Sequence, residues 1–241
     1  MITVNDFFPV IAPGIIHYKL LLSITMASFF PFAIWAQHSN DTAQTVVWKL
    51  SNPNAIAAYT PVILGNPASA GIDSAVAFNG IDDGIVIPSI PMEGWPAFSI
   101  EVLFKPAADG PVAPRFIHFQ DTASNRGTFE IRLTQKGEWY MDTFLKNGNP
   151  AKTNRGLTLI DSSLLHPANE WYWVAMVYDG KTMSSYVNGK KELEGNIDFP
   201  PMTKGQIALG MRLNKVNWFK GMIKEIRFHP TPLNITLLQR L

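Results

Sequence analysis

The sequence predicts an all-β fold in which two antiparallel sheets form a jelly-roll sandwich with a short C-terminal helix. Short strand-like runs recur from Gln37 onward with turn residues between them, and amphipathic helical periodicity is almost absent before the C-terminus. The chain has 241 residues, of which 46% are hydrophobic, which is ample for one well-cored domain. It has no cysteine, so a secreted form would depend on a large core rather than on disulfides.

The N-terminal segment has a composition of its own. After Lys19 comes the uncharged apolar run LLLSITMASFFPFAIWA, which ends in small residues and precedes the polar sequence QHSNDTAQ. This pattern is typical of a secretory signal peptide cleaved near Ala36, and the alternative is a membrane anchor, since about 17 apolar residues is the lower limit for a spanning helix. We expect residues 1–36 to be the signal peptide or anchor and residues 37–241 to be the jelly-roll domain. The protein would then be secreted, periplasmic or at the cell surface, with membrane contact only if the segment is retained.

The balance of charges excludes some classes of partner. Twenty basic and nineteen acidic residues leave a net charge of +1, and no long Lys/Arg run occurs. Nucleic acid is therefore not an expected partner. The lack of cysteine also excludes thiolate metal sites and a cysteine nucleophile.

About eleven runs have the length and residue content of strands: TVVWKL, AVAFNG, GIVIP, FSIEVLFKP, RFIHFQ, TFEIRLT, EWYMDTFLK, EWYWVAMVYD, MSSYVNG, QIALGM and WFKGMIKEIRF. Several turns between them contain dipeptides that tolerate positive φ, namely Lys136-Gly137, Asn147-Gly148, Asp179-Gly180 and Asn188-Gly189. Thr231-Pro232 predicts the start of the short C-terminal helix, LNITLLQRL. Its apolar face would consist of Leu233, Leu237, Leu238 and Leu241.

Alternation within the runs indicates which strands are half buried. In FSIEVLFKP, the residues Ile100, Val102 and Phe104 share one face, and GTFEIRLT and EWYMDTFLK alternate in the same way. EWYWVAMVYD is apolar on both faces. We therefore expect that strand to be central in its sheet and covered on both sides.

Several of these stretches occur in the order and spacing of a known family. They are AVAFNGIDDGIVIP, FSIEVLFKP, the run from Trp171 through VAMVYDG to YVNGKKE, and IALGMRLN followed by FKGMIKEIRF. From Ala75 to Leu241 the chain thus resembles the bacterial laminin-G-like, concanavalin A-like jelly-roll domains of a lectin/glucanase superfamily. The resemblance implies the fold but leaves the function open, because the superfamily contains lectins, carbohydrate-binding modules, glycosidases, lyases and structural modules.

The turn NGIDDG is a candidate calcium site. Asn79, Asp82 and Asp83 place hard oxygen ligands close together, as Ca²⁺ requires. The resemblance also implies a structural Ca²⁺ near this turn, helped by an acidic residue on the last strand, but Lys224 stands at that position here. The alternative is a turn that contains no metal, which is common for Asn/Asp-rich sequences.

A second candidate site follows from alternation. Seven polar side chains fall opposite the apolar face of their strands: Glu101, His118, Gln120, Glu130, Arg132, Tyr140 and Asp142. If these strands are neighbours, the side chains would line a polar groove suited to hydrogen bonding with a glycan. The alternative is a solvated sheet face with cross-strand charge pairs.

Aromatic rings at strand ends and in loops are further candidates for glycan binding. Trp95, Trp139 and Trp218 occupy such positions, whereas Trp48, Trp171 and Trp173 are expected in the core. His118 has no second histidine at metal-ligand spacing, so it does not by itself indicate a metal site.

Three classes of function fit these features. The first is a secreted or cell-surface, non-catalytic lectin-like module that binds a polysaccharide or glycoconjugate. The second is a structural or interaction domain that contacts a cell-surface protein. The third is a glycoside hydrolase or polysaccharide lyase on the same fold. The E-x-D-x-x-E signature usual for hydrolases of the superfamily is absent from the sequence.

Overall fold

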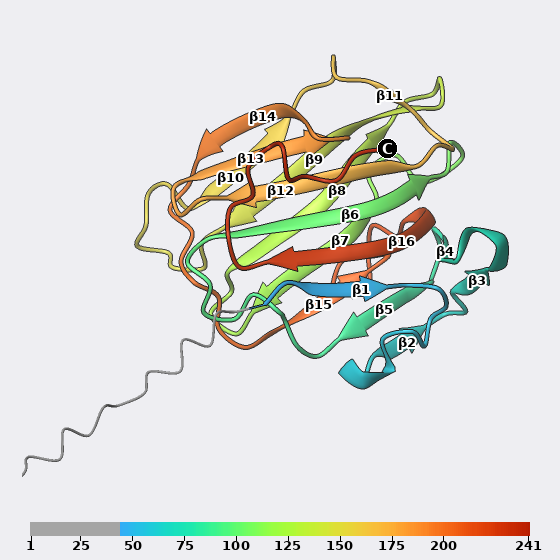
Figure 1. The fold of residues 1–241 in the computed structure, drawn as a ribbon, viewed down its shortest axis with the longest axis horizontal. Coiled ribbons are helices and arrows are strands. Elements are labelled where there is room, and N and C mark those ends of the chain that lie inside the picture. Colours follow the sequence, from blue (N-terminus) through green and yellow to red (C-terminus); the bar gives the residue numbers. More distant parts are fainter. Residues whose placement is uncertain (1–43) are drawn as a thin grey trace, which may run out of the picture. The chain divides into compact units, whose positions relative to one another are not determined.

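A computed structural model describes residues 44–241 of the chain, and the predicted signal peptide or anchor lies outside them. In this part of the chain, no helix is long and apolar enough to span a membrane. The fold is built from two antiparallel sheets of eight strands each, which pack face to face (Figure 1). This confirms the predicted all-β sandwich.

We call the two sheets the β6 sheet and the β8 sheet after a central strand of each. The β6 sheet has the order β14-β13-β12-β6-β16-β4-β3, and β1 pairs with β16 beside β4. Its strands are β1 (Val46–Lys49), β3 (Ala68–Ala70), β4 (Ala75–Asn79), β6 (Phe98–Pro106), β12 (Tyr172–Tyr178), β13 (Thr182–Val187), β14 (Lys190–Asn196) and β16 (Lys220–His229).

The β8 sheet has the order β10-β9-β8-β7-β15-β5-β2, and β11 pairs with one end of β9. Its strands are β2 (Val62–Leu64), β5 (Gly84–Ile87), β7 (Arg115–Asp121), β8 (Arg126–Leu133), β9 (Glu138–Lys146), β10 (Gly156–Ile160), β11 (His166–Pro167) and β15 (Gly205–Leu209). Two 3₁₀ turns, Ala57–Tyr59 and Gly71–Asp73, are the only helical elements of the described residues.

All eleven predicted runs form strands, and five further strands were not predicted. The missed strands are β2, β3, β10, β11 and β14. They are short or polar and lie at or near the edges of their sheets, for example KKELEGN in β14. Such strands offer too few residues or too little apolar content for a clear alternation, and even β10, which alternates, has only five residues.

Aromatic side chains from both sheets fill the space between them. Phe104 of the β6 sheet stacks on Phe116 of the β8 sheet with ring centroids 4.4 Å apart. Trp139 is fully buried, and its ring lies edge-on to Phe104 at 5.2 Å. This core holds the two sheets together and thereby fixes which face of each strand points outward.

Two of the four predicted glycine turns, Asp179-Gly180 and Asn188-Gly189, connect the strands at one edge of the β6 sheet. Asn188 and Gly189 have φ values of 47° and 73°, as the hairpin between β13 and β14 requires. β12 lies between β13 and β6 with every residue buried. The prediction of a strand covered on both sides is confirmed.

The predicted C-terminal helix is wrong. Residues 231–241 contain only a turn at Ile235–Leu237 and otherwise run as an irregular segment across the outer face of the β6 sheet (Figure 1). Their backbone groups bond to the sheet, because Leu233 N–H donates to Ser99 Oγ at 2.8 Å and Gln239 N–H donates to Glu101 Oε1 at 2.6 Å. These backbone N–H groups thus donate to side chains of β6 rather than to backbone carbonyls four residues earlier, as they would in a helix.

Leu238 anchors this C-terminal segment. It is 3% exposed and packs with Ala175, Val177 and Tyr186 on the outer face of the β6 sheet, whereas Leu237 is 62% exposed. We expect Leu238→Ala to lower the free energy of unfolding by about 2 kcal/mol, because it removes a buried leucine. Leu237→Ala is the matched control and should change it by less than about 0.5 kcal/mol. Equal effects in chemical denaturation would contradict this packing.

Candidate functional site

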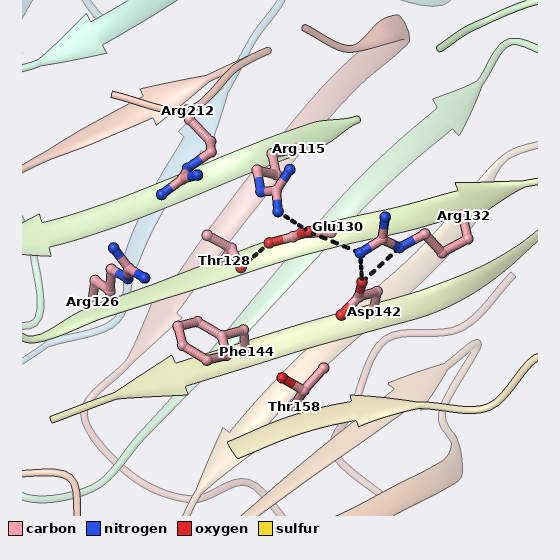
Figure 2. A pocket seen from close by; sticks show the side chains of 9 residues that line it. All are labelled: Arg115, Arg126, Thr128, Glu130, Arg132, Asp142, Phe144, Thr158 and Arg212. Atoms are coloured by element: carbon pink, nitrogen blue, oxygen red, sulfur yellow. Dashed lines mark hydrogen bonds and ion pairs between the residues drawn. The ribbon is translucent and has the colours of Figure 1, made fainter. Parts of the chain in front are cut away.

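The outer face of the β8 sheet carries a pocket of about 240 Å³ with charged walls (Figure 2). Strands β7, β8, β9 and β10 and the loop after β15 contribute to it. The lining residues are Arg115, Arg126, Thr128, Glu130, Arg132, Asp142, Phe144, Thr158 and Arg212.

The alternation of β8 and β9 places most of these side chains. In β8, Phe129 and Ile131 are fully buried in the core, so the residues between and beside them point outward. A bulge in β7 between Arg115 and Ile117 lets Phe116 enter the core while Arg115 stays beside Glu130 on the outer face. Local sequence and core packing together determine the composition of the pocket.

The two carboxylates of the pocket are both engaged. Arg115 binds Glu130 Oε2 at 2.7 Å, and Thr128 Oγ1 donates to Glu130 Oε1 at 2.7 Å. Arg132 binds Asp142 Oδ2 through Nε at 2.7 Å and through its terminal nitrogen at 2.5 Å. Glu130 and Asp142 are 5% and 3% exposed, so both carboxylates are buried, whereas the side chains of Arg115 and Arg132 are 17% and 32% exposed.

Burial also changes the ionisation of Glu130. Desolvation raises the pKa of its carboxyl above the usual value, although the Thr128 hydroxyl and the Arg115 guanidinium oppose this. Asp142, directly opposite on β9, adds a like charge that raises the pKa further.

The other two arginines have no such partner. Neither Arg126 nor Arg212 forms a salt bridge or a side-chain hydrogen bond with any residue in 44–241. The guanidinium group of Arg126 does lie over the Phe144 ring, 5.5 Å from its centre. Burial, followed by the nearby charges of Arg115 and Arg126, lowers the pKa of Arg212 from its usual value. This end of the pocket therefore carries uncompensated positive charge.

His118 lies beside the pocket, directly opposite Thr128 on β8. It is 2% exposed, and its Nδ1 accepts a hydrogen bond from Leu213 N–H at 3.0 Å. Burial lowers the pKa of His118 to about 3, with the charges of Arg212, Arg126 and Arg115 acting in the same direction. The imidazole is neutral at physiological pH and holds the chain next to Arg212 in place.

The structure brings six of the seven predicted groove residues onto one face. His118, Gln120, Glu130, Arg132, Tyr140 and Asp142 all belong to β7, β8 or β9 and share the outer side of the β8 sheet.

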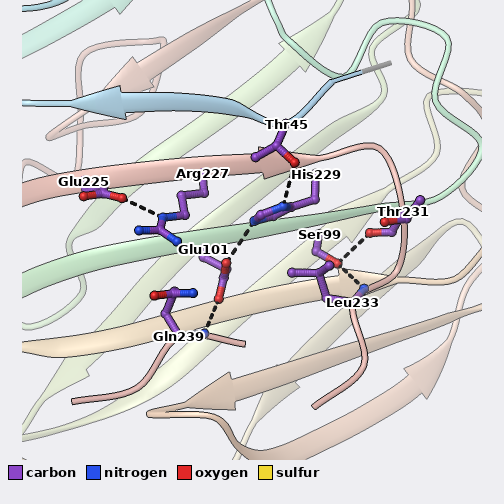
Figure 3. Close-up of polar contacts among 9 residues, drawn as sticks. All are labelled: Thr45, Ser99, Glu101, Glu225, Arg227, His229, Thr231, Leu233 and Gln239. Carbon is purple, nitrogen blue, oxygen red and sulfur yellow. Dashed lines mark hydrogen bonds and ion pairs between the residues drawn. The ribbon is translucent and has the colours of Figure 1, made fainter. Parts of the chain in front are cut away.

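The placement of Glu101 in that groove is wrong. Glu101 is on β6, in the other sheet, because β6 and β7 are consecutive in sequence but lie in different sheets. It bonds to His229 Nε2 at 2.9 Å and holds the C-terminal segment in place (Figure 3). Its role in the structure is to anchor that segment.

The three candidate tryptophans do not line the pocket. Trp139 is fully buried in the core and donates to the Pro167 carbonyl at 3.2 Å, so its ring face is not available to a ligand. Trp95 is partly buried against the core, and Trp218 is partly buried in the loop before β16. Their separate positions do not form a common aromatic platform.

Sequence reasoning missed several lining residues. Phe144 shares the alternation of Tyr140 and Asp142 and could have been found from it. Arg126 likewise shares the face of Glu130 but lies two residues before the predicted run TFEIRLT. Arg115 and Arg212 depend on a bulge and a loop, which no periodicity indicates.

The NGIDDG turn does not fit a calcium ion. Asp83 is 4% exposed, and its two carboxylate oxygens accept hydrogen bonds from Asn66 N–H at 2.7 Å and Asn79 N–H at 3.0 Å. Asn79 Oδ1 accepts from three backbone amides of the turn, the first at 2.8 Å. With these oxygens engaged, the turn lacks the converging set of ligands that Ca²⁺ needs. Lys224 lies elsewhere, 5.9 Å from the centre of the Trp171 ring.

Comparison with known proteins identifies the family. The model of the concanavalin A-like lectin/glucanases superfamily matches residues 79–236, more than half of the chain. The chain belongs to this superfamily, as the sequence resemblance indicated. No match was found among curated proteins.

Solved structures share the fold at low identity. A heptameric SAP-like pentraxin from Limulus polyphemus has a TM-score of 0.51 and 13% identity over 67% of this chain and 77% of its own. The ligand-binding domain of botulinum neurotoxin serotype D, in complex with N-acetylneuraminic acid, has a TM-score of 0.50 and 16% identity over 80% of this chain and 44% of its own. Domain 4 of a GH43 extracellular arabinanase from Geobacillus stearothermophilus, in complex with arabinotriose, has a TM-score of 0.48 and 22% identity over 67% and 73%.

The turn geometry predicts stability that does not depend on calcium. Asp83→Ala should lower the free energy of unfolding by about 2 kcal/mol, because two amides lose a charged acceptor in a buried site. Asp82→Ala is the control, since Asp82 is exposed, and should cost less than about 0.5 kcal/mol. Thermal unfolding with Ca²⁺ and with a chelator should give the same midpoint. A midpoint raised by Ca²⁺ and insensitive to it in Asp83→Ala would contradict this.

His118 predicts an acid-sensitive contribution to stability. Because its pKa is about 3 in the folded protein and 6.5 in the reference state, the unfolded chain binds the proton first as the pH falls. The contribution is complete well above pH 6.5 and decreases by about 3 kcal/mol by about pH 4.5. His118→Asn keeps an acceptor for Leu213 N–H but does not titrate, so its loss of stability over this range should be smaller. Parallel pH profiles would contradict the assignment.

Proposed function

We propose that the protein is a secreted or cell-surface, non-catalytic glycan-binding module that uses the outer face of the β8 sheet. The main support for this proposal is the pocket in that face, which is lined by hydrogen-bonding side chains and by the Phe144 ring. Sugar recognition needs both features, because hydroxyl groups require polar partners and the apolar faces of sugar rings pack on aromatic rings.

Two further points support the proposal. The superfamily to which the chain belongs is described by its lectins and glucanases, and the neurotoxin domain of similar fold is in complex with N-acetylneuraminic acid. These are analogies at the level of the fold. The signal-like N-terminal sequence supports an extracytoplasmic location, which is where most glycan ligands occur.

A glycoside hydrolase is the second candidate, and one observation favours it. Glu130 and Asp142 are directly opposite each other on β8 and β9, and the raised pKa of Glu130 suits a general acid. The arginine contacts favour binding instead, since each carboxylate is already paired with an arginine, Glu130 with Arg115 and Asp142 with Arg132.

A glycan array probed with the full chain tests the proposal. We expect binding to at least one glycan class, weakened about five- to tenfold by Phe144→Ala, because an aromatic contact is removed. Trp171→Ala is the matched control. The expectation that Trp171 lies in the core is wrong, because this residue precedes β12 in the other sheet and its ring is partly exposed beneath Lys105 and Lys224. Binding to no glycan would reject the proposal and favour a protein-interaction domain. Release of reducing ends from a bound polysaccharide would favour the hydrolase.

A further inference from the structure

The pocket has more positive than negative charge. Four of its lining side chains are arginines and two are carboxylates. Each carboxylate has its own arginine, since Arg115 binds Glu130 and Arg132 binds Asp142. Two guanidinium groups, those of Arg126 and Arg212, are therefore left without a counter-charge among residues 44–241.

These two arginines lie on the same side of the pocket. Figure 2 shows Arg126 and Arg212 at the left, with Arg115 to the right of Arg212, Arg132 at the far right and Phe144 below. Arg212 has a buried Nε without a hydrogen-bond partner in the described part of the chain. Unpaired guanidinium nitrogens that face the same hollow form a site for an anion with two or more oxygens.

His118 does not line the pocket, but next to it this residue also has an unused donor. Its Nδ1 accepts a hydrogen bond from Leu213 N–H, so the neutral ring carries its proton on Nε2. That nitrogen is buried and has no partner among residues 44–241. An unused donor in a buried site usually indicates a missing acceptor, because leaving it unpaired is costly. The residue directly opposite His118 is Thr128, which lines the pocket.

We propose that the pocket binds an acidic saccharide residue whose carboxylate or sulfate group is held by Arg126 and Arg212. The inference rests on the glycan-binding function proposed above and specifies its ligand class. The sugar ring would lie along Phe144, and the polar groups of Thr128 and Thr158 would face its hydroxyls. The pocket volume of about 240 Å³ is below the range of pockets for drug-sized ligands, so it suits a single saccharide residue.

Binding measurements with matched probe pairs test the ligand class. The pairs are an oligogalacturonate and its methyl ester, sialyllactose and lactose, and sulfated and unsulfated N-acetylglucosamine, each titrated into the full chain. We expect the acidic member of at least one pair to bind at least about tenfold more tightly than its neutral partner, because it gains charged hydrogen bonds. The first two pairs report a carboxylate ligand and the third reports a sulfate ligand. Raising the salt concentration should weaken the acidic member selectively.

Three arginine variants localise the effect. Arg126→Gln and Arg212→Gln should each weaken binding of the acidic probe about tenfold and leave the neutral probe unchanged. Arg227→Gln is the matched control, since Arg227 is a partly buried arginine on the β6 sheet that pairs with Glu225. The midpoint of thermal unfolding of Arg212→Gln should be unchanged or raised, because a repulsive charge is removed. A lowered midpoint together with lost binding of both probes would assign Arg212 a structural role and overturn the proposal.

The outcomes separate the two proposals. Equal binding of acidic and neutral probes, with no effect of the two variants, would overturn the acidic ligand but leave glycan binding intact. Binding only of neutral glycans on the wider array would have the same meaning. Failure to bind any probe or array glycan would reject both.

Discussion

The burial of alternate side chains of β8 and β9 in the aromatic core is the constraint on which the rest of the structure depends. Phe129 on β8 and Trp139 on β9 are fully buried between the sheets. A shift of one residue in either strand would expose these rings and bury charged groups, so the register has a strong energetic preference. The same preference makes Glu130 and Asp142 direct neighbours on the outer face. The chemistry of the pocket is thus a consequence of core packing on the opposite side of the same strands.

Alternation and turn chemistry predicted much of the fold but only part of the site. The strand runs and the shared face of Glu130, Arg132 and Asp142 follow from a two-residue period that the sequence displays directly. The location of Glu101 does not follow from this period, because long-range packing decides which sheet each of two consecutive strands joins. The C-terminal helix was mispredicted for a related reason. Its leucine spacing is helical, but Glu101 and Ser99 bond the backbone of this segment to the sheet.

The residues that could not be predicted are those placed by irregular structure. Arg115 reaches Glu130 through a bulge, and Arg212 is held in a loop whose neighbour Leu213 bonds to His118. Neither feature has a periodic signal. The calcium expectation failed differently, since the ligand types are present but their oxygens already accept backbone hydrogens in Asp83 and Asn79. Residue type alone does not distinguish a ligand from an acceptor that folding has already used.

The excess of positive charge in the pocket destabilises the folded protein. Like-charged guanidinium groups gathered around a buried, neutral His118 raise the energy of the folded state, and a solvated face with balanced pairs would avoid this. The core can tolerate the cost because its stacked rings, such as Phe104 on Phe116, bury large apolar areas. Departures from local consistency in an otherwise consistent fold are where functional sites are expected. A bound anion would reduce this repulsion, because it supplies the negative charge and the hydrogen-bond acceptors that Arg126 and Arg212 lack among residues 44–241.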